Sequence, residues 1–210
     1  AIDRARNDTL RRELLALAER DQANRAGIMA FVQRVGVGSP QADSAQRALA
    51  AADAPLQARL RAIVADHGWP GRGLAGDDGA HAAWLILQHA DSAWQREMLG
   101  VLRGAVRAND ARVGDYALLE DRVRSSAGLP QRYGNSLKNS ATPGASPLLD
   151  PLERPECVDA RRAAMLLPPL ADYLTMFGIS EPPAATKGTC GDEVSRGSQL
   201  RDHPPRPPLE

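Results

Sequence analysis

The stretch DHGWPGRGLAGDDGAHAAWLILQHADSAWQ, residues 66–95, organises the rest of the chain. It contains three of the four histidines and all three tryptophans, in a chain with only 4% aromatic residues. Its middle, residues 82–87, is the longest unbroken apolar run, with polar residues close on both sides. A helix that is apolar on nearly every side is expected to be buried. We therefore predict a buried helix over roughly residues 78–90 and expect the functional site beside it.

The remaining sequence also has helical periodicity. Leu10, Leu14 and Leu17 recur at the spacing of one helix face, and no segment alternates for long enough to indicate a sheet. Further helices are predicted over residues 8–20, 28–35, 41–66 with a break near Ala54-Pro55, from Asp91 onward, 110–125, 158–166 and 170–177. The prediction is an all-α fold, a compact multi-helix bundle over residues 1–178 with a proline-rich, irregular C-terminal tail over 179–210.

Composition narrows the classes of function. The formal net charge is zero, which argues against nucleic-acid binding, and no apolar stretch approaches the roughly 20 residues of a membrane span. Cys157 and Cys190 are compatible with one disulfide or with two reduced thiols. The expected location is cytoplasmic, and an exported mature chain is the alternative. A small-molecule ligand is the expected partner.

Two histidines flank the apolar helix. His67 lies in the glycine-rich loop before it and His89 at its C-terminal end, and each has the chemistry of an acid, a base or a metal ligand. A favourable interaction with the helix dipole is the structural alternative for His89. On one continuous helix, Asp91 would face about 200° away from His89. The two share a site only if the helix ends between them, and the same break would make Asp91 the N-cap of the next helix.

Metal and phosphate motifs are weak. His67, His89 and Asp91 suit a divalent metal, but no HExxH or paired HxH or CxxC spacing supports one, so no cofactor is expected and a metal stays a minor alternative. The sequence GRGLAG, residues 71–76, spells GxGxxG without a preceding strand, and we interpret it as a flexible loop.

Polar residues recur among apolar ones in the second half. Asp121 and Arg122 are surrounded by Leu118, Leu119 and Val123, so one of the two is expected to point inward. Gln131 and Tyr133 lie in the turn that follows. Tyr133 either presents its hydroxyl to a ligand or covers the end of the bundle with its ring.

Several short motifs, taken in order, resemble one bacterial family of unknown function, number 6624. They are DQANR at 21–25, HGWP at 67–70, QHAD at 88–91, DRV at 121–123, QRYG at 131–134, VDARR at 158–162 and LPPL at 167–170. The resemblance implies a helical domain whose polar signature residues gather in one place, and it implies no established activity. The family usually has threonine and glutamine where this chain has Asn135 and Ser136.

Together these observations predict a small hydrolase or transferase acting on a small polar or anionic substrate. His89 is the predicted general acid/base, and Asp91 orients it or binds substrate. The predicted substrate-binding residues are Asp21, Gln22, Arg25, His67, Gln95, Asp121, Arg122, Gln131 and Tyr133, with Arg25 and Arg122 holding an anionic group. One alternative is a non-catalytic binding module in which the same residues form a structural hydrogen-bond network. Another is a metal-dependent hydrolase.

Overall fold

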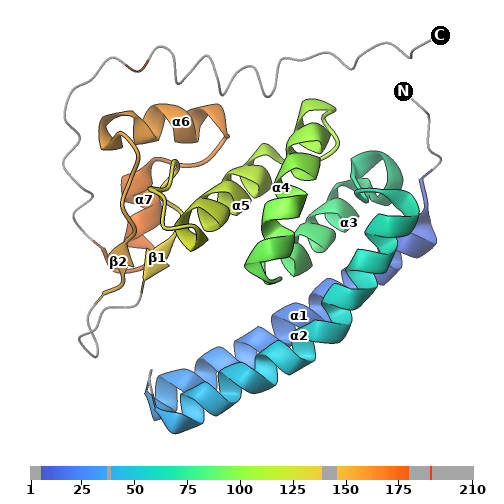
Figure 1. The fold of residues 1–210 in the computed structure, drawn as a ribbon, viewed down its shortest axis with the longest axis horizontal. Coiled ribbons are helices and arrows are strands. Elements are labelled where there is room, and N and C mark those ends of the chain that lie inside the picture. Colours follow the sequence, from blue (N-terminus) through green and yellow to red (C-terminus); the bar gives the residue numbers. More distant parts are fainter. Residues whose placement is uncertain (1–5, 37–38, 139–145, 180–189, 191–210) are drawn as a thin grey trace. The chain divides into compact units, whose positions relative to one another are not determined.

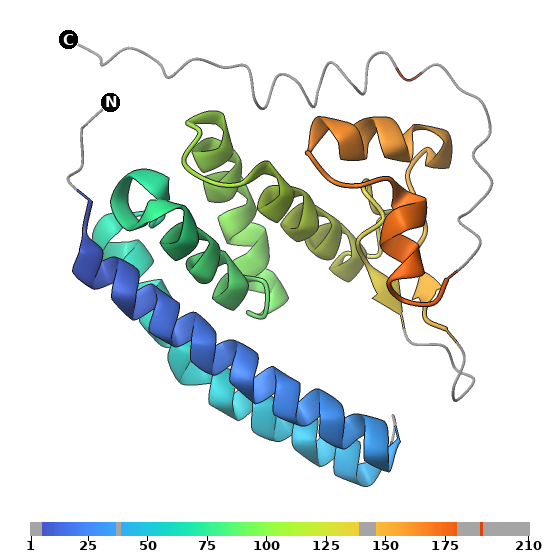
Figure 2. The same ribbon diagram turned by 180° about the vertical axis from the view of Figure 1, so that it is seen from behind.

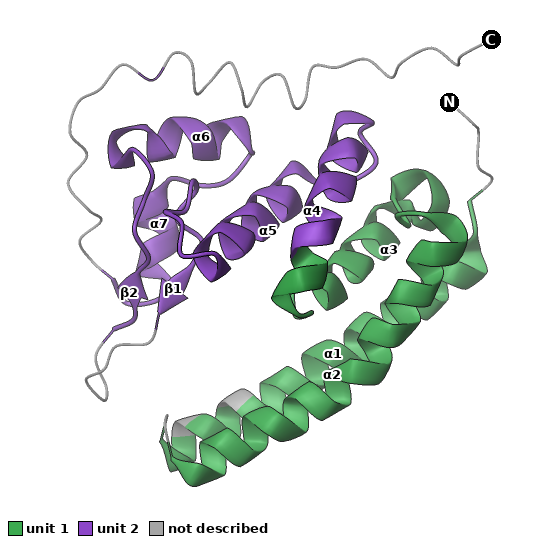
Figure 3. Cartoon of the chain, in the orientation of Figure 1, with its two compact units in different colours: residues 1–95 green, residues 96–210 purple. Residues whose placement is uncertain are grey.

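A computed structural model describes residues 6–36, 39–138, 146–179 and 190. Within these ranges it contains seven α-helices, one short 3₁₀ turn and one two-stranded sheet, which confirms the all-α class. The chain divides into two compact units, unit 1 over residues 1–95 and unit 2 over residues 96–210 (Figure 3). Of the predicted tail, only residues 179 and 190 lie among those described.

Unit 1 is built on two long helices that lie side by side (Figures 1 and 2). Helix α1 (Asp8–Val35) and helix α2 (Pro40–His67) have 28 residues each. Side-chain oxygens cap both N-termini: Asn7 accepts the Leu10 amide of α1, and Ser39 accepts the Ala42 amide of α2. Both helices contribute buried leucines, and α2 an isoleucine, to the core. They are Leu10, Leu14, Leu56, Leu60 and Ile63.

Two predicted interruptions are wrong. The separate helices expected over 8–20 and 28–35 are one continuous helix, α1. Helix α2 also continues through Pro55, where a break was expected. An internal proline removes one backbone hydrogen bond and destabilises a helix by about 3 kcal/mol. Burial of Leu56 and Leu60 on the following turns offsets that loss, because each fully buried leucine contributes about 1.5–3 kcal/mol.

The predicted buried helix is confirmed as the end of α3 (Arg72–Leu87), which packs against α1 and α2. The helix kinks at Gly76, whose φ of 74° is unfavourable for residues with a side chain. Helical structure begins at Arg72, so the loop predicted over 67–76 is shorter than expected. Trp84, Ile86 and Leu87 are at most 5% exposed, as their apolar surroundings in the sequence predict.

Helix α4 (Ser92–Arg107) starts in unit 1 and continues into unit 2. Unit 2 then contains α5 (Val113–Ser126), strands β1 (Leu137–Lys138) and β2 (Leu148–Leu149), a 3₁₀ turn (Pro155–Cys157), α6 (Val158–Ala164) and α7 (Leu170–Thr175). The two strands pair antiparallel, with Leu137 opposite Leu149 and Lys138 opposite Leu148. Val158, Leu170 and Leu174 form the centre of a small apolar core. Among the described residues, no helix is both long and apolar enough to cross a bilayer.

Candidate functional site

The QHAD motif forms the turn between α3 and α4. Helix α3 ends at Leu87, and Asp91 caps α4 by accepting the Trp94 amide at 2.9 Å. The helix therefore ends before both His89 and Asp91, and not between them, which was the condition stated for a shared site; a site shared by the two stays a prediction. The capping role foreseen for Asp91 is confirmed.

Two glutamines hold this turn in place. The Gln95 side chain donates to the backbone oxygens of Gln88, at 2.8 Å, and Ala90, at 2.9 Å. The Gln57 side chain of α2 donates to the His89 backbone oxygen at 3.0 Å. Gln95 is 4% exposed, so its amide satisfies carbonyl groups that the end of α3 leaves without helical partners. Its predicted role as a substrate ligand stays a prediction.

The His89 ring contacts a buried carboxylate of α1. Its Nδ1 lies 3.2 and 3.1 Å from the two oxygens of Asp21, whose side chain is 1% exposed. An ionised carboxylate only accepts hydrogen bonds, so this contact places a proton on Nδ1. In the neutral ring Nε2 is then the unprotonated nitrogen, and it has no hydrogen-bond partner among the described residues. The His89 side chain is 17% exposed.

Arg25 neutralises part of the charge in this cluster. Its guanidinium contacts Asp21 at 3.0 and 3.2 Å and Asp53 of α2 at 2.6 Å. Burial acts to raise the pKa of Asp21, but the hydrogen bonds from His89 and Arg25 outweigh that effect, and the pKa is lowered. Asp21 is therefore a stable anion beside the histidine.

The carboxylate that contacts His89 is thus Asp21 and not Asp91. Besides capping α4, Asp91 pairs with Arg61 at 2.7 Å, and the Arg61 guanidinium lies 4.1 Å from the centre of the Trp94 ring. The hydrogen bond from Trp94 and the charge of Arg61 lower the pKa of Asp91. The predicted orienting role of Asp91 has no contact to support it, and its role as a substrate ligand stays a prediction.

The other predicted residues of unit 1 differ in their surroundings. The Gln22 side chain is exposed and donates to Asp21 at 2.7 Å. Arg25 is occupied by its two carboxylates, so anion binding would require it to exchange a partner. His67 is the exposed last residue of α2. The roles of all three in binding substrate stay predictions.

Unit 2 contains a second buried carboxylate, Asp121, which is 0% exposed, whereas Arg122 is exposed. One member of this pair was predicted to point inward, and this is confirmed. Asp121 accepts the backbone amides of Arg132 at 2.7 Å, Tyr133 at 3.0 Å and Asn135 at 3.0 Å. The Asn135 side-chain amide donates to it as well, at 3.1 Å. Burial raises the pKa of Asp121, although these donors act in the opposite direction.

The other predicted residues of this loop are also engaged by the protein itself. Gln131 is 0% exposed, and its side chain donates to the backbone oxygens of Ser136 and Asp150 while accepting the Ser136 amide. The Tyr133 hydroxyl donates to Glu120 at 3.1 Å, and the ring is 1% exposed. Tyr133 is thus buried with its hydroxyl paired to Glu120, and both of its predicted roles, presenting the hydroxyl to a ligand or covering the end of the bundle, stay predictions.

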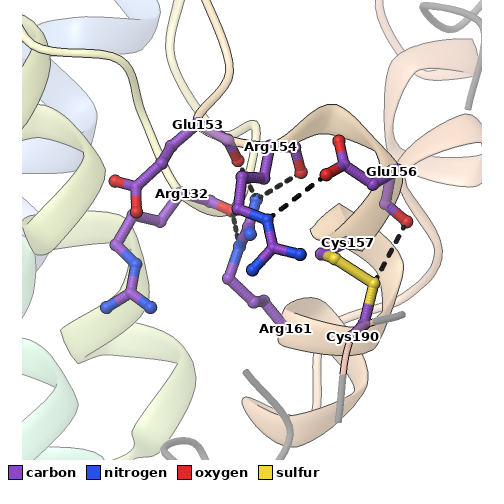
Figure 4. The surroundings of a disulfide bond; sticks show 7 residues. All are labelled: Arg132, Glu153, Arg154, Glu156, Cys157, Arg161 and Cys190. Atoms are coloured by element: carbon purple, nitrogen blue, oxygen red, sulfur yellow. Dashed lines mark hydrogen bonds and ion pairs between the residues drawn. A yellow bond between two sulfur atoms is a disulfide. The ribbon is translucent and has the colours of Figure 1, made fainter. Parts of the chain in front are cut away.

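Two adjacent buried arginines complete the network. Arg162 donates to the backbone oxygens of Pro168, at 2.6 Å, and Tyr133, at 2.5 Å, and to the Asn135 side chain at 3.1 Å. Burial lowers its pKa. Arg161 donates to the backbone oxygens of Arg132, Glu153 and Arg154, next to a disulfide between Cys157 and Cys190 (Figure 4).

The eleven predicted site residues divide between the units, seven in unit 1 and four in unit 2. Within unit 1 the structure brings Asp21, Gln22, Arg25 and His89 together. Within unit 2 it joins Asp121, Gln131 and Tyr133 around one loop. A single centre made from all eleven stays a prediction.

The sequence interpretation missed Asp53, Asn135, Arg161 and Arg162 as members of these clusters. A signal for Asp53 was present, because it falls on the same helix face as Leu56, Leu60 and Ile63. A carboxylate on an apolar face needs a buried partner. The arginines were noticed only as part of a motif, since nothing in their spacing indicates burial.

Within the ranges that the structure describes, no three His, Cys, Asp or Glu side chains are grouped to hold a metal ion. His67, His89 and Asp91 therefore form no such group. The metal-dependent alternative stays a prediction.

Comparison with known proteins points to a family and not to an activity. No curated protein and no solved structure matches the chain. The family described as a family of unknown function, DUF6624, matches residues 8–180. Because the match extends over most of the chain, including both clusters, the protein belongs to this family of unknown function, DUF6624.

Proposed function

We propose that the protein is a small enzyme in which His89 acts as general acid/base on a small polar substrate. The observation that carries the proposal is the contact between Asp21 and His89 Nδ1. A buried carboxylate on one ring nitrogen fixes the tautomer and leaves the other nitrogen to exchange a proton. In a hydrolysis, Nε2 would take a proton from the attacking water and return it to the leaving group.

The charges near His89 favour a polar substrate over an anionic one. Asp21 and Asp53 carry two negative charges against the single positive charge of Arg25. One oxygen of Asp53 is buried and has no hydrogen-bond partner among the described residues. A buried acceptor of this kind favours a ligand that donates hydrogen bonds, such as a hydroxyl or an amine. Anion binding by Arg25 is the less favoured form of the prediction.

The test screens many candidate substrates at once. Wild-type protein and His89→Gln are incubated with an extract of small molecules, and untargeted mass spectrometry records which ions are consumed. We expect ions that the wild type consumes, with turnover reduced roughly 10²–10⁴-fold in His89→Gln, the usual contribution of a general acid or base. Asp21→Asn should be impaired in the same direction. His81→Gln is the control, because His81 lies on α3, which precedes His89, and stacks on Trp84. Identical profiles for wild type and folded His89→Gln would show that the proposal is wrong.

One observation favours the non-catalytic alternative. In unit 2, Asp121, Gln131 and Arg162 direct their hydrogen-bonding groups at the protein's own backbone. If all of the predicted site residues likewise bond only the protein itself, His89→Gln and Arg162→Met would both alter stability or partner binding. Neither variant would then change the turnover of any substrate.

The disulfide supports an exported location, the alternative to the expected cytoplasmic one. Disulfides persist in oxidising compartments and are rare in the cytosol. Cys157 is 0% exposed and is bonded to Cys190, 33 residues away. Alkylation of thiols in acid-quenched source cells should leave both cysteines unmodified, whereas labelling of both would support the cytoplasm.

A further inference from the structure

A pocket of about 360 Å³ lies within unit 2, and none of the residues used in the proposed chemistry lines it. Its walls come from residues 147–152, which include β2, from the start of the 3₁₀ turn, and from α7 with Ile179 beyond it. The lining consists of three prolines, four leucines, one isoleucine and one aspartate. The volume falls within the range of roughly 300–1,000 Å³ that small-molecule sites occupy.

The fold already holds several of these walls in place. Leu174 is 0% exposed and belongs to the centre of the small apolar core. Leu149, Leu152 and Ile179 pack against that core. Strand β2 is paired with β1, and the Ile179 amide donates to the Leu174 backbone oxygen at 3.1 Å. A pocket whose walls are fixed before binding loses little free energy to ordering when a ligand enters.

The walls offer few hydrogen-bond donors to a ligand. Pro147, Pro151 and Pro155 have no backbone N–H. The backbone amide of Asp150 is already used, because it donates to the Ser136 backbone oxygen at 3.1 Å. A ligand rich in polar groups would therefore give up its hydrogen bonds to water without replacing them in this pocket.

The charge of the lining favours an uncharged ligand. Of the described residues that line the pocket, Asp150 alone is charged. A carboxylate in the wall, with no basic residue in the same lining, repels an anion. Only 7% of the Asp150 side chain is exposed, and one of its oxygens contacts the Lys138 ammonium at 2.8 Å, so it offers little surface to a cation.

We infer that this pocket binds a small uncharged ligand with a mainly apolar body. An apolar cavity of only about 150 Å³ is enough to take up a molecule such as benzene. Leu148 also lines the pocket and is 60% exposed, so the lining can be reached from solvent, and a bound ligand would remove apolar surface from water. The inference concerns binding alone and does not depend on the chemistry proposed for His89.

The test uses the full oxidised chain and three probes that share one ring. Benzyl alcohol is uncharged, benzoate carries a negative charge and benzylammonium a positive one. Titrations followed by methyl NMR should show benzyl alcohol binding, with shifts at Leu149, Leu152 and Ile179, and both charged probes binding at least tenfold more weakly. A charged probe that binds as tightly as benzyl alcohol would overturn the inference.

Variants separate binding from folding. Leu148→Asp should weaken benzyl alcohol binding at least tenfold, because it places a charge in the apolar lining. Leu129→Asp makes the same change at a residue of unit 2 that is 52% exposed and lies outside the lining, so it should leave binding unchanged. Leu148→Met keeps the wall apolar and should bind within about twofold of the wild type.

Two further results would contradict the inference. It is overturned if benzyl alcohol does not bind at about 10 mM, a concentration that detects even millimolar affinities. It is also overturned if folded Leu148→Asp binds as tightly as the wild type or if the shifts lie elsewhere.

Discussion

Asp21 in unit 1 and Asp121 in unit 2 are both buried aspartates, but their partners are of different kinds. Asp21 is held by the side chains of Arg25 and His89, and its pKa is lowered. Asp121 is held mainly by backbone amides of one loop, and burial raises its pKa. The first carboxylate is thus bonded to an imidazole and a guanidinium, and the second mainly to the backbone of a loop.

This difference separates two uses of buried polar residues. A carboxylate that accepts backbone amides cannot change partners unless the loop moves, so Asp121 fixes the conformation of residues 131–136. A carboxylate against an imidazole with 17% of its side chain exposed can respond to a proton or a ligand without any change of the backbone. Burial of a signature residue therefore does not by itself indicate catalysis. What distinguishes the two clusters is the partner of the carboxylate, which is an imidazole in unit 1 and a set of backbone amides in unit 2.

The largest expected effect tests the structural role of unit 2. Arg162→Met removes the donor for the Pro168 and Tyr133 carbonyls and for Asn135, and leaves these acceptors buried. Removing one member of a buried polar network of this kind costs about 3–5 kcal/mol. Urea unfolding should report this loss, and hydrogen exchange should show that residues 131–136 lose protection. Arg107→Met, at an exposed position, should change stability by less than about 0.5 kcal/mol. A stable Arg162→Met protein with an intact loop would contradict the structural interpretation.

The next effect tests the packing of the same loop. Gly134 has a φ of 77°, and a Cβ there would lie 2.6 Å from a Leu170 methyl carbon. Gly134→Ala should therefore destabilise the protein by about 2–4 kcal/mol through backbone strain and overpacking together. Gly128→Ala is a matched control, since Gly128 has a similar φ of 71° but nothing within 4 Å of its Cβ position.

The difference between these two glycine variants isolates the contact with Leu170. Strain alone should cost Gly128→Ala about 1–2 kcal/mol. Equal losses for the two variants would show that the loop is not packed tightly against α7.

The sequence predicts the fold class and the buried helix because these depend on periodicity over many residues. It fails at Pro55, where a local rule against internal proline is outweighed by the buried leucines that follow. It also divides α1 in two, because the polar stretch after residue 20 resembles a linker. In fact α1 has a buried stripe that includes Leu14 and Ala18, and Asp21 lies on the next turn of the same stripe.

The sequence finds the candidate site only in part. It identifies His89 and foresees that the helix ends before Asp91, since capping is a local property. It predicts that Asp91, two residues away, orients His89 or binds substrate, whereas the carboxylate that contacts the ring is Asp21, 68 positions earlier in the chain. Such a long-range partner depends on how α1 packs against α3, and no spacing in the chain encodes it.

A smaller effect sharpens the assignment of His89. Its contact with Asp21 is expected to contribute about 1 kcal/mol of coupling, measured by a double-mutant cycle of Asp21→Asn and His89→Gln in urea unfolding. The same cycle with His81→Gln should give a coupling energy near zero, because His81 stacks on Trp84 instead. Equal couplings in the two cycles would show that the observed contact is not formed in solution.

The smallest effect compares the two carboxylates directly through pH. The pKa of Asp21 is lowered from 3.8, so its contribution to stability is present above that value and is lost as pH falls through the folded-state pKa. The stability difference between wild type and Asp21→Asn should therefore shrink on acidification from neutral pH. The pKa of Asp121 is raised from 3.8. Its contribution to the stability of the folded protein is therefore fully present below pH 3.8 and is lost as pH rises through the folded-state pKa.

The stability difference between wild type and Asp121→Asn should consequently grow on acidification, opposite in sign to that for Asp21→Asn. For one proton the slope cannot exceed about 1.4 kcal/mol per pH unit, so urea unfolding must be measured at several pH values between neutral and acid. Slopes of the same sign would mean that both carboxylates are held by the same kind of interaction. Opposite slopes would tie Asp21 to its side-chain donors His89 and Arg25, and Asp121 to the backbone amides of its loop, where burial outweighs the hydrogen bonds.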